Sequence, residues 1–342
     1  MRCFRLRVFW RGKVRNLKTV WLEGKTVRLI DQRLLPEKLQ ILRADTVEKV
    51  ANAIQTMAVR GAPAIGATAA YGMALAELRG DDIKKAYRRL LRTRPTGHDL
   101  FHALGIMLDS WREGDSLVEA SRAYAAELEN RCMSIGRHGA GLIKDGSSIL
   151  THCNAGALAT VDYGTATAPL RVAHAKGRKF FVFIDETRPR LQGALLTAWE
   201  LCQEGIDHAV IADNAAGLFL SKGEVDLVLV GADRIAANGD TANKIGTYEK
   251  AVVAAENHVP FYVAAPSSTV DFTARNGKEI EIEERDPEEV LSFRGVRIAP
   301  RQSNALNPAF DVTPAKYITG FITENGIFSP SGLAGLRRTL RR

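Results

Sequence analysis

From residue 147 onward, short apolar runs rich in β-branched residues alternate with longer segments of helical pattern, and this alternation limits the possible folds more than any other feature of the sequence. Strands that alternate with helices are typical of a parallel sheet with helices on both faces. We therefore predict an α/β, doubly wound unit here. The predicted strands are residues 148–151, 180–184, 209–211, 225–230, 261–264 and 317–321.

The first 145 residues have a different pattern, in which β-rich runs come before helical segments. The β-rich runs are residues 8–10, 19–22 and 26–30. Thr46 can cap a first helix, and Pro63 stands where a second would begin. Residues 82–144 continue as helix, with a break near Pro95. We predict a small α+β domain over residues 1–131 and a catalytic domain over residues 132–342.

Composition narrows the class of partner and the compartment. The formal net charge of +8 favours anionic partners. The basic residues are scattered, without a stripe interleaved with aromatic residues, so we expect no nucleic-acid partner. No apolar run reaches about 18 residues and no signal peptide is evident, so we expect no membrane partner and a cytoplasmic protein. The cysteines Cys3, Cys132, Cys153 and Cys202 form no CxxC pair, which argues against structural disulfides or zinc.

Polar and reactive side chains collect directly after the predicted strands. Ligands of open parallel sheets bind beyond the carboxyl ends of the strands. One polar residue there would mean little, because loops and helix caps are polar anyway, but several groups together predict an active site. The groups are His152-Cys153-Asn154, Asp185-Glu186-Thr187-Arg188 with Gln192, Asp213-Asn214, Asp233-Arg234 and Ser267-Ser268-Thr269.

The loops contain neither a dinucleotide fingerprint nor a P-loop, so we expect no nucleotide cofactor. Backbone amides at glycine-rich turns can still bind a phosphate group. Residues 156–160 and 164–166 offer such turns.

Several long segments of the sequence resemble signature motifs of the methylthioribose-1-phosphate isomerase family. The resemblance extends from about Leu29 to Glu324, which is nearly the whole chain, and the segments named next are part of it. They are Val59-Arg60-Gly61-Ala62-Pro63-Ala64-Ile65-Gly66, Thr151-His152-Cys153-Asn154-Ala155-Gly156, Asp185-Glu186-Thr187-Arg188-Pro189-Arg190-Leu191-Gln192-Gly193, Gly231-Ala232-Asp233-Arg234-Ile235, Asn243-Lys244-Ile245-Gly246-Thr247 and Asn307-Pro308-Ala309-Phe310-Asp311-Val312-Thr313-Pro314.

The resemblance implies an N-terminal α+β domain on a Rossmann-like C-terminal domain, usually in a homodimer. It implies an aldose–ketose isomerase of methionine salvage that converts 5-methylthioribose 1-phosphate to 5-methylthioribulose 1-phosphate. Two relatives share part of the pattern: the ribose-1,5-bisphosphate isomerases, and non-catalytic regulatory subunits of the exchange factor for translation initiation. The retained segments of Cys153 and Asp233 argue against the regulatory subunits.

The sequence departs from the family pattern at two places. Gly97-His98-Asp99 stands where the family usually has Ala-Val-Asn, and Val161-Asp162 comes before Tyr163-Gly164. Both lie near the expected substrate. These two departures from the family pattern therefore bear on which substrate the protein uses.

The implied isomerisation needs an acid for the ring oxygen and a group that handles the hydrogen on C2. We expect Asp233 to be the acid, because an apolar setting raises the pKa of a carboxyl. The Arg234 guanidinium would lower the pKa of Asp233 if its side chain turned toward the carboxyl. Alternatively, Asp233 could simply cap a helix. Cys153 is the second expected catalytic residue, although free cysteines are usually inert core residues.

The other site residues are implied by the resemblance alone. Arg60, Gly61 and Ala62 are expected to bind substrate, with Arg60 on the phosphate. Arg94, Gln192, Asn243 and Lys244 are expected as further contacts. Each could equally be an ordinary surface or helix residue. His98 and His102 have the spacing of metal ligands but lack a third ligand, so we expect no metal.

Overall fold

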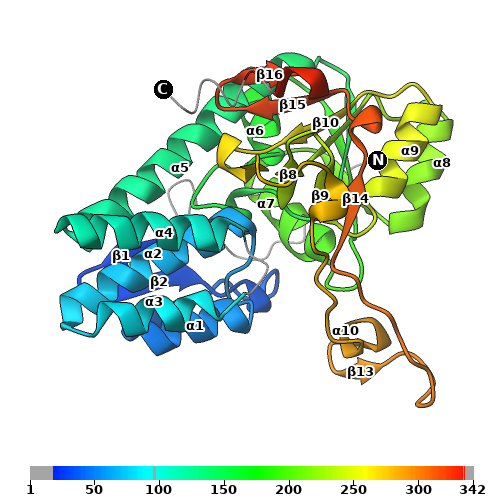
Figure 1. Cartoon of the computed structure of the whole chain (residues 1–342). Helices are drawn as coiled ribbons and strands as arrows, with labels where there is room; N and C mark the ends of the chain where they lie inside the picture. The colour runs from blue at the N-terminus through cyan, green and yellow to red at the C-terminus, as the bar shows by residue number, and fades with distance from the viewer. Residues whose placement is uncertain (1–17, 95–97, 334, 336–342) are drawn as a thin grey trace.

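A computed structural model describes residues 18–94, 98–333 and 335 of the chain. Figure 1 shows a helical part formed by the N-terminal residues, in blue and cyan, beside a larger part built around a central sheet. The long helix α5 (Leu117–Gly139) runs from the first part to the second. The predicted boundary between residues 131 and 132 falls inside α5, so the division at that point stays a prediction.

The N-terminal part combines an antiparallel sheet of order β1-β2-β3 with several helices. The predicted strands near residues 19–22 and 26–30 are confirmed, β3 was not predicted, and the run at 8–10 lies outside the described residues. The predicted break near Pro95 lies outside the described residues; α3 ends before it and α4 begins after it. The elements are β1 (Val20–Glu23), β2 (Thr26–Ile30), β3 (Ile41–Ala44), α1 (Val47–Gln55), α2 (Ala62–Arg79), α3 (Ile83–Leu91) and α4 (His98–Glu113).

Helix α2 is the centre of this part. It begins after Gly61, with Pro63 in its first turn as predicted. Its alanines and glycines are buried on all sides, which allows α4 and α5 to pack closely against it. This packing fixes where the first turn of α2 points.

The larger part contains a seven-stranded sheet of order β16-β15-β10-β7-β4-β5-β6, parallel except for β16. Side chains of β7 alternate between the two faces: Leu227 and Leu229 pack with α6 and α7, whereas Val228 and Val230 pack with α8 and α9. Each such burial contributes about 1.5–3 kcal/mol. The predicted α/β class is therefore confirmed. The strands are β4 (Ser148–Thr151), β5 (Phe181–Asp185), β6 (His208–Ile211), β7 (Leu227–Val230), β10 (Phe261–Ala264), β15 (Gly320–Thr323) and β16 (Gly326–Phe328).

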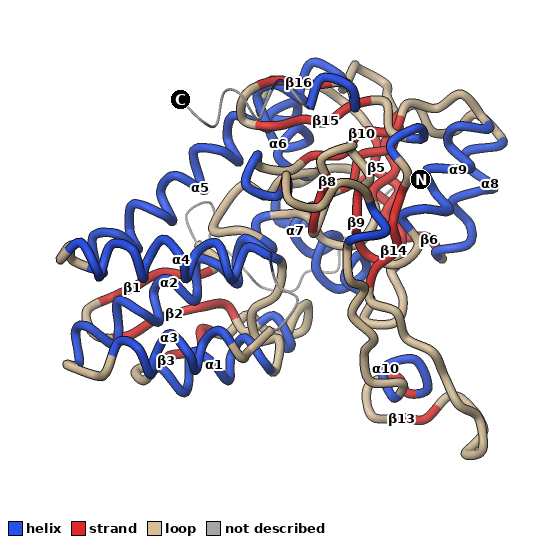
Figure 2. The backbone as a smooth tube through the Cα atoms, viewed as in Figure 1, coloured by secondary structure: helices blue, strands red, loops and turns tan. Residues whose placement is uncertain are grey.

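The helices of this part cover both faces of the sheet, as Figure 2 shows. They are α6 (Thr167–Ala175), α7 (Ala198–Glu204), α8 (Ala216–Ser221) and α9 (Thr247–Glu256). Within the described ranges, no helix is both long enough and apolar enough to span a membrane.

A second, smaller sheet of order β11-β8-β9-β14 was not predicted. Strand β8 starts one residue after Asp233, so this sheet stands at the edge where the active site was expected. Its strands are β8 (Arg234–Ala236), β9 (Thr241–Lys244), β11 (Val270–Asp271) and β14 (Phe310–Thr313). An arm that contains α10 (Glu288–Leu291), β12 (Ser292–Phe293) and β13 (Val296–Arg297) projects from the body in Figures 1 and 2.

Candidate active site

One pocket, with a cavity volume of about 140 Å³, lies at the carboxyl ends of the strands and is closed on one side by the first turns of α2 and α4. The nine residues that were assigned a catalytic or substrate-binding role line it, whereas the predicted strand-end groups at residues 185–188, 213–214 and 267–269 do not. The nine are Arg60, Gly61, Ala62, Arg94, Cys153, Gln192, Asp233, Asn243 and Lys244. The fold therefore brings segments from both halves of the chain to one place. The role of each residue stays a prediction.

Cys153 lies just beyond β4, in a backbone conformation that few non-glycine residues adopt, with φ of +62°. Two threonines hold it there. The Cys153 amide donates to Thr187 Oγ1 at 2.9 Å, and Thr197 Oγ1 donates to the Cys153 carbonyl at 2.7 Å. Burial raises the pKa of the Cys153 thiol, while Arg60 and Lys244 act in the opposite direction. The two cations therefore stabilise the thiolate, whereas burial disfavours it.

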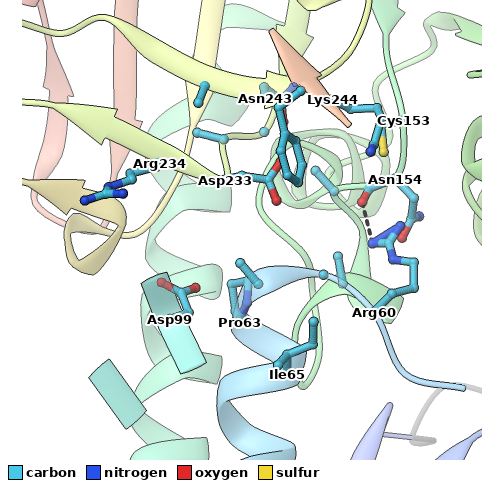
Figure 3. Close-up of a pocket in the computed structure, with 18 of the residues that line it drawn as sticks. Arg60, Pro63, Ile65, Asp99, Cys153, Asn154, Asp233, Arg234, Asn243 and Lys244 are labelled. Atoms are coloured by element: carbon cyan, nitrogen blue, oxygen red, sulfur yellow. Dashed lines mark hydrogen bonds between the residues drawn. The ribbon is translucent and has the colours of Figure 1, made fainter. Parts of the chain in front are cut away.

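Asp233 follows β7, and its backbone amide donates to the carbonyl of Ala242 at 2.9 Å. Burial raises the pKa of its carboxyl, with Lys244 and Arg60 opposing the shift. Arg234, which could have weakened this effect, instead donates from Nε to Asp271 at 2.9 Å, and Figure 3 shows its side chain extending away from Asp233. Asp233 thus has the surroundings expected of a proton donor.

Arg60 and Gly61 connect the N-terminal part to the loop of Cys153. The Arg60 guanidinium donates to the Asn154 carbonyl at 2.8 Å, and burial lowers the pKa of Arg60. Gly61 has φ of +93°, and a Cβ there would lie 2.5 Å from Cα of Ala159. Only glycine therefore allows this close approach.

Lys244 and Asn243 enter the pocket from β9. The Lys244 ammonium donates to the Ala309 carbonyl at 2.7 Å and lies 4.5 Å from the centre of the Phe310 ring. Burial lowers the pKa of Lys244, whereas Cys153 and Asp233 raise it. Asn243 is buried and donates to Thr247 Oγ1 at 3.0 Å.

Four of the cationic side chains in the pocket are already paired with carboxylates. They are Arg94 with Glu283, Arg190 with Glu289, Arg234 with Asp271, and Arg285 with both Glu283 and Glu289. Within the described part of the chain, Arg60 and Lys244 form no salt bridge. These two cations are the natural contacts for an anionic ligand.

Gln192 and Arg94 differ from Arg60 and Lys244 in how they are held. Gln192 is buried, and its Oε1 finds no hydrogen-bond partner among the described residues. A ligand can therefore use this oxygen. Arg94 donates to Glu283 at 2.8 Å, so a ligand would have to share this guanidinium with that carboxylate.

The turn at residues 156–160, which the sequence offered as a phosphate site, is occupied by a carboxylate of the protein. Glu200 accepts hydrogen bonds from the amides of Ala157 at 2.7 Å and Leu158 at 3.2 Å. The prediction of a phosphate cradle at this turn is therefore wrong.

One group of possible metal ligands occurs in the described residues: His152, Asp185 and Asp213. The oxygens of Asp213 accept from the amides of Thr187 and Arg188, and the Lys250 ammonium lies 3.5 Å from Asp185 Oδ2. Because a lysine already supplies a positive charge there, we interpret the group as a structural network.

Asp99 is a pocket residue to which the sequence assigned no role. It lies in the first turn of α4, and burial raises the pKa of its carboxyl to about 7. The only sequence signal was its departure from the family pattern.

We predict that Asp99→Asn stabilises the protein increasingly as pH rises from 4 to 8. The unfolded chain releases the Asp99 proton near the ordinary pKa of 3.8, and the folded chain only near 7. Ionisation thus favours the unfolded state across this window, by about 4 kcal/mol at most for a shift of about three pKa units. Thermal unfolding of both proteins against pH measures the difference. Asp109→Asn, at an exposed position of the same helix, is the control, and a flat difference for Asp99→Asn would contradict a buried neutral acid.

Comparison with known proteins identifies the family of the chain. Residues 58–330 match the model of the Initiation factor 2 subunit family. A methylthioribose-1-phosphate isomerase from Aquifex aeolicus is 51% identical, over 96% of this chain and 72% of that protein. The crystal structure of a 5-methylthioribose 1-phosphate isomerase from Pyrococcus horikoshii OT3 is similar with a TM-score of 0.88 and 45% identity, over 95% of this chain and 96% of that one. The crystal structure of the translation initiation factor eIF-2B, subunit delta, from A. fulgidus is similar with a TM-score of 0.85 and 41% identity, over 96% of this chain and all of that one.

Proposed function

The chain belongs to the Initiation factor 2 subunit family, and we infer that it is an isomerase of that family, which converts 5-methylthioribose 1-phosphate to 5-methylthioribulose 1-phosphate. One observation carries the proposal. Cys153 and Asp233 line the same pocket as Arg60 and Lys244, so an acid, a thiol and two cations that form no salt bridge within the described ranges surround one cavity.

The roles follow from the chemistry of the substrate. Its anomeric oxygen carries phosphate, so the furanose cannot open as a free sugar does. Arg60 and Lys244 bind the phosphate, Asp233 protonates the ring oxygen, and Cys153 acts beside the carbons between which hydrogen moves. Asp233 can give a proton near neutral pH because burial raises its pKa.

The charge of the pocket favours a substrate with one phosphate over ribose 1,5-bisphosphate. A second phosphate would need another cationic subsite, yet the remaining arginines are paired with carboxylates. Met57, Ile65, Leu100 and Ile280 add apolar surface to the pocket lining, which suits a methylthio group.

The test is turnover of both candidate substrates, measured side by side with the purified protein. We expect turnover of 5-methylthioribose 1-phosphate at a kcat/KM well above that for ribose 1,5-bisphosphate. The reverse order would favour the bisphosphate isomerase. Binding without turnover of either substrate would favour a regulatory subunit, the alternative that similarity to the initiation-factor subunit keeps open.

We predict that Arg60→Ala mainly weakens substrate binding. A buried hydrogen bond to a charged group contributes about 1.5–3 kcal/mol, so KM is expected to rise by about 10- to 150-fold. Steady-state kinetics of this variant measure the change, and Arg88→Ala, at an exposed position of α3, is the control for loss of charge. An unchanged KM would argue against a phosphate contact at Arg60.

We also propose a homodimer in the cytoplasm that uses no cofactor. Light scattering after size-exclusion chromatography tests the oligomeric state, and a monomeric mass would contradict the proposal.

A further inference from the structure

The most unusual group in the pocket is the carboxyl of Asp99. The residue is only 3% exposed, yet it lines the pocket. Its Oδ1 is buried and has no hydrogen-bond partner among the described residues. A buried polar atom without a partner is unfavourable, so a ligand that supplies one is favoured by the free energy that this restores.

Figure 3 shows where a ligand would meet this carboxyl. Asp99 rises from α4 toward the space beside Asp233, while Arg60 and Cys153 lie on the other side of Asp233. The proposed phosphate contacts and Asp99 thus lie on opposite sides of the proposed acid. A ligand that reaches Asp99 contacts it with a part remote from its phosphate.

Asp99 can accept a hydrogen bond whether or not it is ionised. Burial and the neighbouring Asp233 raise its pKa, while Arg131 opposes the shift. Its position in the first turn of α4 opposes the shift as well, although a helix dipole changes a pKa by less than about one unit. A carboxylic acid keeps one acceptor oxygen, and a carboxylate has two.

We propose that Asp99 is a specificity-determining residue that accepts a hydrogen bond from the C3 hydroxyl of the substrate. The inference rests on the proposed function, because the sugar named there has hydroxyls only on C2 and C3. The C2 oxygen becomes the ketone at the reacting centre, which leaves the C3 hydroxyl. The same carboxyl, when ionised, repels a second phosphate.

The experiment compares 5-methylthioribose 1-phosphate with its 3-deoxy analogue on wild type, Asp99→Leu and Asp99→Asn. Wild type is expected to lose about tenfold in kcat/KM on the analogue, the size of one neutral hydrogen bond. Asp99→Leu is expected to lose about tenfold on the parent substrate and nothing further on the analogue. Asp99→Asn keeps an acceptor oxygen and should still discriminate. Asp109→Leu, exposed on the same helix, should behave as wild type.

Two outcomes overturn the proposal. Equal kcat/KM of wild type on both compounds removes the C3 contact, whatever the variants do and even if Asp99→Leu fails to fold. A full tenfold preference that survives in Asp99→Leu assigns the contact to another residue. In both cases wild type still turns over the parent substrate, so the proposed function stands. Wild type inactive on the parent substrate would instead remove both.

Discussion

Asp233→Asn is expected to lower kcat for 5-methylthioribose 1-phosphate by about 10²- to 10⁴-fold, the usual contribution of a general acid. The amide has nearly the shape of the carboxyl but has no acidic proton to give to the ring oxygen. Asp233 lies near Arg60 and Lys244, and the neutral amide keeps the charge of the protonated carboxyl that the acid role requires. KM is expected to change much less than kcat, because the proton is needed in the transition state.

Both steady-state kinetics and thermal unfolding of Asp233→Asn are measured. The first detects a loss of catalysis, and the second detects a loss of stability. A matched control is Asp226→Asn, at the opposite end of β7, where the exposed carboxylate accepts from the Ser148 amide at 2.8 Å. That variant should keep its kcat. If Asp233→Asn also retains a kcat near that of wild type, Asp233 is not the acid.

The parallel sheet could be predicted from sequence because its strands are buried on both faces. Runs such as Leu227–Val230 are then apolar without interruption. The small second sheet could not be predicted in the same way. Strand β9 contains Thr241, Asn243 and Lys244. It pairs with its chain neighbour β8 on one side, but its partner on the other side, β14, is distant in the chain. Tertiary contacts, rather than β propensity, decide such a strand.

The residues of the site could be predicted from sequence motifs, but the contacts between these residues could not. Gly61 belongs to a recognisable segment, yet its closeness to Ala159 appears only in the fold. The pairing of Arg94 with Glu283 joins residues far apart in sequence. Likewise, nothing local shows that Glu200 accepts hydrogen bonds from the amides of Ala157 and Leu158, so the sequence alone predicts a phosphate site at a turn that is already occupied.

Cys153→Ser is expected to lose most of the activity, because an alcohol is a far poorer base and carrier of charge than a thiol. The backbone should tolerate the change, since its bonds to Thr187 and Thr197 involve only the amide and carbonyl of residue 153. kcat and the melting temperature test the two statements separately. Cys202→Ser, at an exposed position of α7, is the control and should remain active.

Alkylation of the thiol gives a second measurement. Because Cys202 is exposed and would react as well, the experiment uses the Cys202→Ser protein, in which Cys132 is buried. Inactivation is expected to accelerate as pH rises, since burial raises the pKa of Cys153 and the thiolate is the reactive form. Arg60→Ala removes a cation that lowers this pKa, so at a given pH alkylation should be slower in that background. Substrate should slow it too. Mass spectrometry identifies the modified residue, and activity loss that follows Cys3 or Cys132 instead of Cys153 would remove the thiol from the proposed catalytic pair.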